Sequence, residues 1–236
     1  MSKIYSFNLN SNFSIKIEKP FVLPKHLINS VDKFWVMNKG LFGNSFNNGN
    51  IYFLVKHNEK QLTIQLGKYK YALARISHAK RFNLPVFNYK IDINPLAVTG
   101  VLVCKDGLVI GKRANTVGTD TNLWEPAPAG GLCLPNPKTQ LLDELNTEIG
   151  LSSDSIYSIQ SRGLVCDVDS GVFDIVYVLY TLLSSNEILK YKKKLATDEY
   201  SELSFVKIKK INEFIEKNDK NLIPAFKNML HLSRLI

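Results

Sequence analysis

The stretch LWEPAPAGGLCLPNPKTQLLDELNTEIGL, residues 123–151, decides the fold, because it reads as a strand, a glycine-rich turn and a helix in succession. We predict an amphipathic helix from Pro137 to Ile149, ended by Gly150, the residue type that most easily adopts a left-handed conformation past a helix end. Leucine and isoleucine residues at helical spacing form its buried stripe. The turn before it, residues 128–131, lets backbone approach a ligand closely.

The polar face of this helix carries two glutamates. Glu144 and Glu148 are four residues apart and therefore lie on one face, where two like charges repel by a few tenths of a kcal/mol. A divalent cation between them would convert this repulsion into binding. Two surface glutamates on a helix are the alternative, but the glycine-rich turn and the Gly150 stop favour a metal site. A backbone carbonyl of the turn, at Gly130, would add a hard oxygen ligand.

The segment resembles a degenerate Nudix box, whose family pattern is G-x5-E-x7-R-E-U-x-E-E-x-G-U with U an aliphatic residue. Five residues fall on the second E, the first U, the last E, the G and the final U of that pattern: Glu144, Leu145, Glu148, Gly150 and Leu151. In this family the glutamates bind Mg²⁺ or Mn²⁺. The resemblance therefore implies Mg²⁺ or Mn²⁺ bound by Glu144, Glu148 and Gly130.

The box also departs from the family pattern. Asp143 stands where the family has Arg, and Thr147 stands where it has the first Glu of the EE pair. The loop is one residue short if Gly130 is the box glycine and two residues short if it is Gly131. The upstream acidic position then falls on Asn136 or Pro137. Loss of one ligand implies fewer or weaker metal sites than in the family.

The flanking sequence extends this resemblance. Residues 94–114 read as a β-hairpin, residues 156–183 as two antiparallel strands, residues 201–217 as a strand and a short helix, and Pro224 opens a C-terminal helix. Order and spacing resemble an α/β/α Nudix sandwich over residues 94–236. We therefore assign the chain to the α/β class.

The first 93 residues form a separate, mainly β domain in this interpretation. Strand-like runs occupy residues 3–10, 13–20, 50–57 and 61–71, with a helix over 25–37 and a loop over 41–50. This order, with Leu66-Gly67, Tyr69-Lys70 and the irregular box, is similar to the Nudix-type UDP-sugar diphosphatases.

Further candidate site residues lie outside the helix. Arg113, at the exit of the first hairpin, could clamp a phosphate or could be a surface residue at a strand end. Asp174 interrupts the apolar run VFDIVYVLY, which favours either a site residue or an outward-facing edge position. Glu125 and Glu202 resemble positions where family members place acidic residues, with Glu199 and Asp198 as competitors of Glu202. Residues of the turn that would contact substrate are Gly130 and Gly131.

Three residues of the first domain are weaker candidates. Tyr69, Tyr71 and Arg75 could contact a nucleotide base, or the tyrosines could simply be half-buried in packing.

Composition narrows the function classes. The chain has 236 residues, 45% of them hydrophobic, which suffices for one large or two modest domains. We find no apolar run of about 18 residues and no signal-peptide pattern, and we expect a cytoplasmic protein without a membrane segment. Cys104, Cys133 and Cys166 show no CxxC spacing, so we expect reduced thiols.

The net charge of +9 invites comparison with nucleic-acid-binding proteins. The lysines are spread along the chain, and the densest cluster, Lys190 to Lys194, lies beside acidic residues, as on a solvated helix face. We expect no nucleic-acid partner, because a basic surface also attracts a small polyanionic substrate.

The resemblance implies a pyrophosphatase that hydrolyses a diphosphate linkage in a nucleotide sugar such as UDP-glucose, giving a nucleoside monophosphate and a sugar phosphate. The implied catalytic residues are Glu144, Glu148 and Glu202, with Glu202 or Glu144 as proton acceptor. Many relatives are dimers, so a homodimer stays open. The main alternative is a Nudix-like nucleotide-binding or regulatory domain without hydrolysis, which Thr147 and Asp143 favour. A nucleic-acid-binding β domain ranks last.

Overall fold

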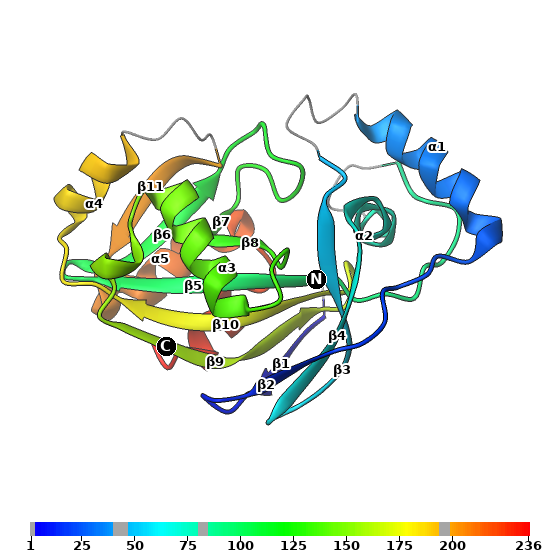
Figure 1. The fold of residues 1–236 in the computed structure, drawn as a ribbon. Helices are drawn as coiled ribbons and strands as arrows, with labels where there is room; N and C mark the ends of the chain where they lie inside the picture. The colour runs from blue at the N-terminus through cyan, green and yellow to red at the C-terminus, as the bar shows by residue number, and fades with distance from the viewer. Residues whose placement is uncertain (1–2, 40–46, 80–84, 194–198) are drawn as a thin grey trace.

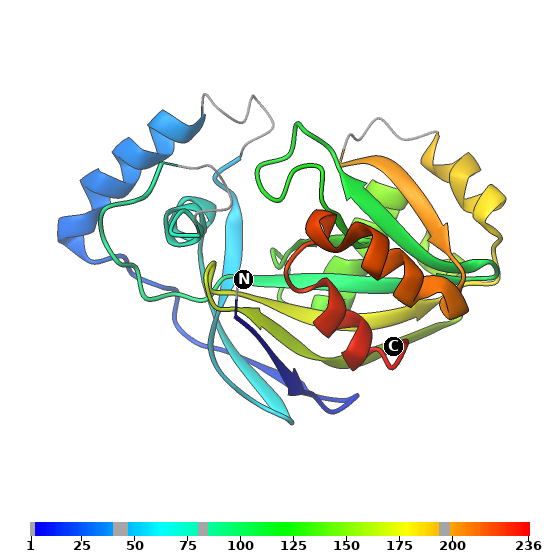
Figure 2. The same cartoon turned by 180° about the vertical axis from the view of Figure 1, so that it is seen from behind.

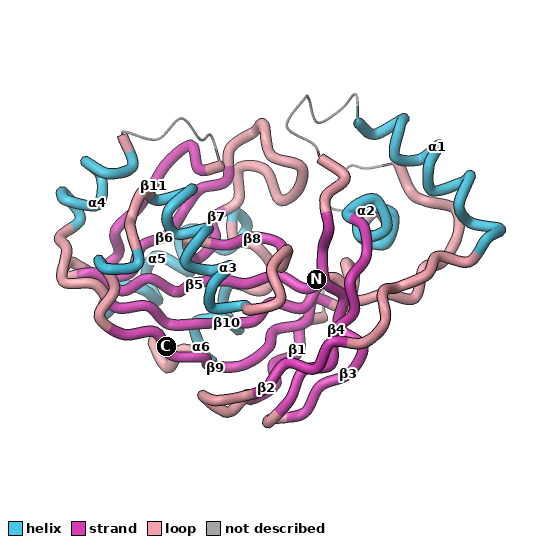
Figure 3. The backbone as a smooth tube through the Cα atoms, viewed as in Figure 1, coloured by secondary structure: helices cyan, strands magenta, loops and turns pink. Residues whose placement is uncertain are grey.

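The computed structural model describes residues 3–39, 47–79, 85–193 and 199–236, which form two β-sheets with helices packed around them (Figures 1 and 3). The first part of the chain contains β1 (Ile4–Asn8), β2 (Ser14–Ile17), α1 (Ile28–Lys39), β3 (Asn50–Asn58), β4 (Gln61–Lys68) and α2 (Tyr69–Ile76). The remainder contains β5 (Leu96–Cys104), β6 (Gly107–Arg113), β7 (Trp124–Pro126), β8 (Ala129–Gly131), α3 (Pro137–Glu144), β9 (Ser158–Asp167), β10 (Val172–Tyr180), α4 (Ser185–Lys192), β11 (Tyr200–Val206), α5 (Ile211–Asn218) and α6 (Phe226–Leu232).

The larger sheet has the strand order β1-β9-β10-β5-β6-β11, with β8 paired to β5 and β7 paired to β6. Its central strands alternate their side chains between two cores. On β10, Ile175 and Tyr177 belong to one core, whereas Val176 and Val178 belong to the other. Such an apolar strand, buried on both sides, needs a helical layer on each face of the sheet.

These two layers come from different parts of the chain. On one face, α3 contributes Leu141, which is fully buried with residues of β5 and β10, and α4 contributes Ile188. On the other face, α5 and α6 pack through residues that include Ile215 and Phe226. Figures 1 and 2 show the two layers from opposite sides. The predicted α/β class, with helices on both faces of the sheet, is confirmed.

The smaller sheet has the order β2-β4-β3 and supports α1 and α2. The position of Gly67 on β4 has a steric reason, since a Cβ there would overlap the Phe53 ring of β3. Strand β1 pairs with β9 in the larger sheet instead. Residues 4–8 of the predicted first domain therefore complete the sheet of the second, while the division at residue 93 stays a prediction.

Strands β5 and β6 form the predicted hairpin, but they pair only at Val103–Leu108 and Cys104–Gly107. Beyond these pairs they separate, and β8 lies against β5 while β7 lies against β6. This divergence separates the two strands along most of their length, a feature that their hydrophobic pattern did not indicate.

One predicted strand and one predicted helix end at other residues than the sequence indicated. The strand expected over 61–71 stops at Lys68, and Tyr69 begins α2. The helix expected over 137–149 is an α-helix to Glu144 and a π-helical turn over Leu145–Ile149. The π turn arises because the Gly150 amide bonds the carbonyls of Leu145 and Asn146, and Gly150 has the expected left-handed conformation, with φ 85°.

Some expectations fall partly on undescribed residues. Residues 41–46 of the expected loop over 41–50, together with Lys194 and Asp198, lie outside the described ranges. Within those ranges, no helix has the length and apolar character needed to cross a membrane. Short 3-10 turns occupy Lys25–Leu27, Ser153–Ser155, Ile208–Lys210 and Asp219–Asn221.

Candidate functional site

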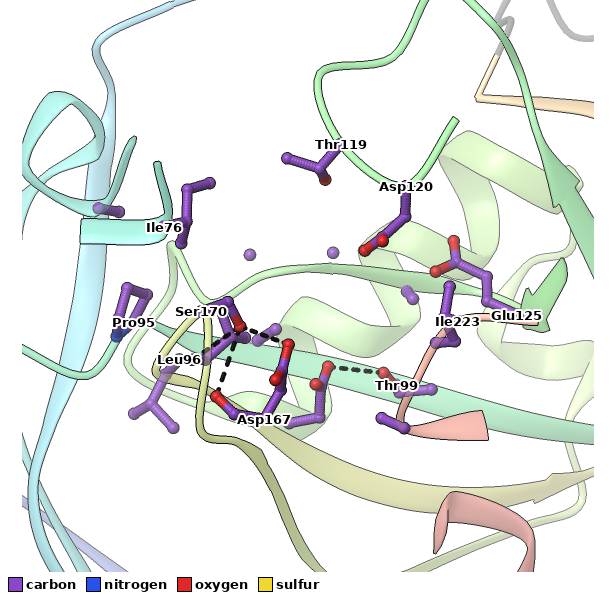
Figure 4. A pocket seen from close by; sticks show the side chains of 18 of the residues that line it. Ile76, Pro95, Leu96, Thr99, Thr119, Asp120, Glu125, Asp167, Ser170 and Ile223 are labelled. Carbon is purple, nitrogen blue, oxygen red and sulfur yellow. Dashed lines mark hydrogen bonds between the residues drawn. The ribbon is translucent and has the colours of Figure 1, made fainter. Parts of the chain in front are cut away.

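A pocket of about 370 Å³ lies where β5 and β6 diverge (Figure 4). Its lining comes from β5, β7, β8, the helix after β8, and the turn between β9 and β10. Helix α2 and strand β3 of the N-terminal part close one side of the pocket through Ala72, Ile76 and Ile51. Residues far apart in the chain therefore build one site.

Glu148 is held at the wall of this pocket. It lies in the π turn, it is buried, and its Oε2 accepts a hydrogen bond from the Ala129 amide at 3.0 Å. Burial raises its pKa well above the usual value, and the neighbouring carboxylates of Glu144, Glu199 and Glu125 raise it further. A buried carboxylate among like charges stays ionised most readily when a cation lies beside it.

Glu144 lies at the end of α3 and also lines the pocket. Burial raises its pKa to about 7, although a hydrogen bond from Gln140 opposes that shift. The Gln140 amide nitrogen donates to Glu144 Oε1 at 2.7 Å, and the amide oxygen of Gln140 accepts from the backbone N–H groups of Cys133 and Leu134. Gln140 thereby orients Glu144.

The glycine-rich turn packs directly against Glu144. A Cβ on Gly130 would overlap the Glu144 carboxylate, whereas a Cβ on Gly131 would lie 3.3 Å from the Ile51 side chain. Gly130 is therefore the position at which close approach of backbone to carboxylate requires glycine.

Hydrogen bonding along β8 decides which carbonyl faces the glutamates. Gly100 donates to the Pro128 carbonyl, Leu132 donates to the Leu96 carbonyl, and Gly130 lies opposite Val98. In an antiparallel ladder alternate residues point their backbone groups to opposite edges, so Pro128 and Gly130 face β5. Ala129 faces the other edge, as its bond to Glu148 requires. We infer that the Ala129 carbonyl, and not that of Gly130, is the backbone ligand candidate.

Arg113 is engaged in a buried ion-pair network, with its side chain 13% exposed. Its Nε donates to the Thr119 carbonyl at 2.9 Å, and its two other nitrogens contact Glu125 at 2.7 Å and Glu199 at 3.2 Å. Burial lowers the pKa of Arg113, but these two carboxylates raise it more, so the net shift is upward. Glu125 has a raised pKa because it is buried, and Arg113 opposes that shift.

At the other side of the pocket, Asp174 of β10 lies beside Thr99 of β5, whose hydroxyl donates to Asp174 Oδ1 at 2.9 Å. Burial raises the pKa of Asp174 to about 7 despite this hydrogen bond. Nearby, Asp167 accepts a hydrogen bond of 2.7 Å from the Ser170 hydroxyl. Because Asp174 is enclosed by the fold and lines the pocket, the alternative that it faces outward at a sheet edge is wrong.

Most of the predicted site residues line this one pocket, although their roles stay predictions. They are Arg113, Glu125, Gly130, Gly131, Glu144, Glu148 and Asp174. Glu202 does not line it and is exposed, because a register shift on β11 sets Tyr200 opposite Arg113 but Glu202 opposite Lys112. Its competitor Glu199 lines the pocket, and Asp198 lies outside the described residues.

The candidates from the N-terminal part have other surroundings. Tyr69 lines the pocket at the start of α2, whereas Tyr71 packs against the core that α1 and α2 share. Arg75 donates to the carbonyls of Asp169 and Val168, at 3.1 and 3.4 Å, and does not line the pocket. Its role is to tie α2 to the turn between β9 and β10.

Sequence reasoning missed several residues that line the pocket or support it. Gln140 carried a signal, since it is four residues before Glu144 and hence on the same helix face. Asn136 begins α3 by accepting hydrogen bonds from the amides of Lys138 and Thr139. Residues with no recognisable sequence signal are Thr99, Asp120, Asp167 and Ser170.

The oxygen atoms around the glutamates could provide some, but not all, of the ligands of a divalent cation. Glu144, Glu148 and the Ala129 carbonyl supply oxygen ligands, and the space left by Gly130 brings the backbone against Glu144. Within the described ranges, no group of three or more His, Cys, Asp or Glu side chains is arranged to hold a metal ion. A site here would therefore use two carboxylates and backbone.

No family model and no curated protein sequence matches the chain. Solved structures resemble it, among them the NUDIX domain of Shewanella oneidensis NrtR complexed with ADP ribose, at 14% identity and a TM-score of 0.46 over 62% of this chain and 92% of that one. A NUDIX hydrolase from Nitrosomonas europaea gives 16% identity and a TM-score of 0.44 over 60% and 88%. A bifunctional NMN adenylyltransferase/ADP ribose pyrophosphatase from Francisella tularensis gives 14% and 0.46 over 70% and 45%.

All three TM-scores lie below 0.5 and all three identities below 25%, so we infer no function from these likenesses. The chemistry of the pocket follows from its own residues.

Proposed function

We propose that the protein is a metal-dependent hydrolase of the diphosphate linkage in a nucleoside diphosphate derivative. The observation that carries this proposal is the pair of glutamates held against the glycine-rich turn, with Glu148 bonded to the Ala129 amide and Glu144 bonded to Gln140. Two oriented carboxylates and a backbone carbonyl at the wall of a pocket are a donor set suited to Mg²⁺ or Mn²⁺.

The chain's own residues divide the work. Glu144, Glu148 and the Ala129 carbonyl would hold the metal, and Gly130 leaves the space that brings them together. When bound, the metal supplies positive charge that stabilises the negative charge developing on the diphosphate and makes a water molecule more acidic.

Arg113 acts as a positioning residue in this proposal. Its nitrogens contact the Thr119 carbonyl and the carboxylates of Glu125 and Glu199. Arg113 therefore orients these two carboxylates and does not bind a phosphate. Glu199 has one oxygen on Arg113, and its side chain is 31% exposed at the pocket. It is the carboxylate most accessible to water in this network, and we assign to it the proton acceptor role that the sequence suggested for Glu202.

A nucleotide sugar such as UDP-glucose is the substrate that we propose, with nucleoside monophosphate and sugar phosphate as products. The pocket volume of about 370 Å³ falls in the usual range for small-molecule sites. Its lining combines the carboxylates with apolar side chains of α2 and β3.

Replacing Gly130 with Ala should weaken metal binding by roughly 10- to 100-fold, the range usual when the support of a metal ligand is disturbed. The added methyl would displace the Glu144 carboxylate, which lies at the end of a flexible side chain, so the fold should survive. Calorimetric titration with Mn²⁺ and a thermal unfolding curve measure the two effects. The matched control is Gly131→Ala, whose methyl contacts only Ile51; equal losses in both variants would contradict the special role of Gly130.

A nucleotide-binding module without hydrolysis is the second candidate. It is favoured by Thr147, which replaces a box glutamate and whose hydroxyl donates to the carbonyls of Asp143 and Glu144. It is also favoured by the lack, among the described residues, of a group of three side chains suited to a metal.

A substrate panel tests both candidates. UDP-glucose, ADP-ribose, a dinucleoside polyphosphate and UTP are each incubated with Mg²⁺ or Mn²⁺, with EDTA as control, and the phosphate-ester products are quantified. Metal-dependent cleavage of a nucleoside diphosphate derivative is the result expected. No cleavage, combined with thermal stabilisation by one of these nucleotides, would favour the binding module. Neither cleavage nor stabilisation would contradict both.

A further inference from the structure

A buried tyrosine hydroxyl at the start of β11 has no hydrogen-bond partner. The Tyr200 side chain is buried, and among the described residues its hydroxyl neither donates nor accepts a hydrogen bond. The side chain belongs to the same core as Leu145 and Ile149, in the π turn that carries Glu148. A buried polar group without a partner costs stability, and such groups in folded proteins commonly gain a partner from an ion, a water molecule or a ligand.

Strand pairing fixes the position of the Tyr200 ring. Tyr200 lies opposite Arg113 of β6, and β6 in turn pairs with β7 (Figure 1). A Cβ on Gly111 would lie 2.4 Å from a carbon of the Tyr200 ring. The ring therefore lies over the backbone of β6, and Gly111 is the residue whose missing side chain leaves room for it.

The charge of Glu148 acts on the Tyr200 hydroxyl. Burial raises the pKa of Tyr200 well above its usual value, and among the charged groups Glu148 raises that pKa most, ahead of Glu125. Electrostatic interactions weaken with distance, so the hydroxyl lies within reach of the charge of Glu148. A hydroxyl with a raised pKa stays protonated, and towards a carboxylate it is a donor.

Glu148 lacks a strong donor, whereas Glu125 has one. The Arg113 guanidinium donates to Glu125 and pairs with its charge. Within the described ranges, Glu148 accepts a hydrogen bond only from the uncharged Ala129 amide. A hydrogen bond between a hydroxyl and an ionised carboxylate is stronger than a neutral one, and groups behind a metal ligand commonly fix its orientation. Glu148 is therefore the carboxylate that the Tyr200 hydroxyl would serve.

We propose that Tyr200 is a positioning residue for Glu148, and that its hydroxyl donates to the Glu148 carboxylate, directly or through one water molecule, when that carboxylate binds the metal. Tyr200 does not line the pocket and therefore acts through Glu148 without touching the substrate. This inference rests on the proposed function for the assignment of Glu148 to the metal.

Tyr200→Phe removes the hydroxyl and keeps the ring over Gly111, so this variant should fold. Its Mn²⁺ affinity, followed by electron paramagnetic resonance, should be roughly 10- to 100-fold lower than that of the wild type, the usual effect of losing a group behind a metal ligand. Its unfolding temperature without metal should equal or exceed that of the wild type, because the lost hydroxyl has no partner there. A tyrosine that serves only in packing would leave Mn²⁺ affinity unchanged, and that outcome would overturn the proposal.

Tyr177 provides the matched control. It is buried in the same core, and its pKa is raised by burial with no contribution from a charged group. Tyr177→Phe should therefore retain the Mn²⁺ affinity of the wild type. Equal losses of affinity in Tyr177→Phe and Tyr200→Phe would reveal a general effect of the core and refute a specific role of Tyr200.

A double variant tests whether Tyr200 acts through Glu148. Glu148→Gln removes the charge with which the hydroxyl pairs, so adding Tyr200→Phe should lower Mn²⁺ affinity by no more than about twofold further. A further loss of roughly 10-fold in this background would assign the hydroxyl to another group, such as Glu125, and would contradict the proposal.

The absorption of tyrosine gives a signature that does not depend on turnover. A tyrosine that donates to a carboxylate absorbs at longer wavelength than one without a partner. Saturating Mg²⁺ should therefore produce a tyrosine difference spectrum in the wild type and in Tyr177→Phe that Tyr200→Phe lacks. The same spectrum in the wild type and in Tyr200→Phe would overturn the proposal.

The outcomes remain separate from those of the hydrolysis panel. A protein that hydrolyses a diphosphate linkage but keeps its Mn²⁺ affinity in Tyr200→Phe would retain the proposed function and lose the role of Tyr200. Reduced Mn²⁺ affinity in Tyr200→Phe without any hydrolysis by the wild type would retain that role and lose the enzymatic assignment. A wild type that does not bind Mn²⁺ would contradict both.

Discussion

Glu148→Gln should lower kcat/KM by roughly 10³-fold while the protein stays folded, because several kcal/mol of metal-dependent stabilisation correspond to factors of this size. Glutamine keeps the shape of the side chain and can still accept the hydrogen bond from the Ala129 amide. It lacks the negative charge that a divalent cation requires. Steady-state kinetics and Mn²⁺ binding followed by electron paramagnetic resonance measure the two consequences, and Mn²⁺ binding should weaken along with turnover.

Glu148→Gln should not lose thermal stability, although it loses activity. The folded state raises the pKa of Glu148, so the native protein binds this proton more tightly than the unfolded chain. In the absence of metal, the ionised carboxylate therefore reduces stability at pH values above its unfolded pKa. Glutamine removes that cost, and its unfolding temperature at pH 8 should equal or exceed that of the wild type.

The same change at Glu202 is the matched control. Glu202 is exposed and does not line the pocket, so Glu202→Gln should retain the activity of the wild type. Full turnover and Mn²⁺ binding in Glu148→Gln, or loss of turnover in Glu202→Gln with Glu148→Gln unaffected, would show that we have assigned the wrong carboxylate.

Arg113→Met should destabilise the protein by about 3–5 kcal/mol, the usual result of removing one partner from a buried ion pair. Glu125 has a side chain that is 8% exposed, and it would be left among other carboxylates without its cation. Methionine preserves most of the buried volume, so the loss reports charge and hydrogen bonding more than packing. Denaturant unfolding at neutral pH measures the change in free energy.

A second substitution separates the charge effect from the others. The double variant Arg113→Met/Glu125→Gln has no buried carboxylate at position 125. Much of the free energy of unfolding that Arg113→Met loses should therefore return, because replacing both partners of a buried ion pair by neutral residues changes stability little. Activity should stay low because Glu199 has lost its partner. A stable Arg113→Met protein with only a raised KM would instead support direct binding of a phosphate by Arg113, as the sequence first suggested.

The local elements of this fold follow from local sequence. The left-handed Gly150, the helix that Asn136 and Pro137 begin, and the turn at residues 105–107 between β5 and β6 all depend on residues within a few positions of each other. Burial of α3 through Leu141 and Leu145 follows from helical spacing. These features were predictable because capping, turn chemistry and hydrophobic periodicity act over short distances.

The end of α2 and the place of β1 were not predictable in this way. The run ending in Lys68-Tyr69-Lys70-Tyr71 continues the alternation of a strand, yet Tyr69 begins a helix whose Ala72 and Ile76 contact distant parts of the chain. Tertiary contacts overrode the local pattern. Strand β1 joined the larger sheet because β9 offered an edge, and an alternating strand does not specify its partner.

The sequence by itself determined that this chain has a helix with two glutamates on one face behind a glycine-rich turn, since that arrangement needs only helical spacing and the conformational freedom of glycine. Tertiary structure alone decided that β5 and β6 diverge, that Glu199 and not Glu202 lines the pocket, and that Arg113 is committed to Glu125 and Glu199. It also decided that residues of α2 and Asp174 line one pocket. The physical reason is that strand register, burial and charge pairing depend on which segments meet in space, as the register shift between Tyr200 and Glu202 on β11 illustrates.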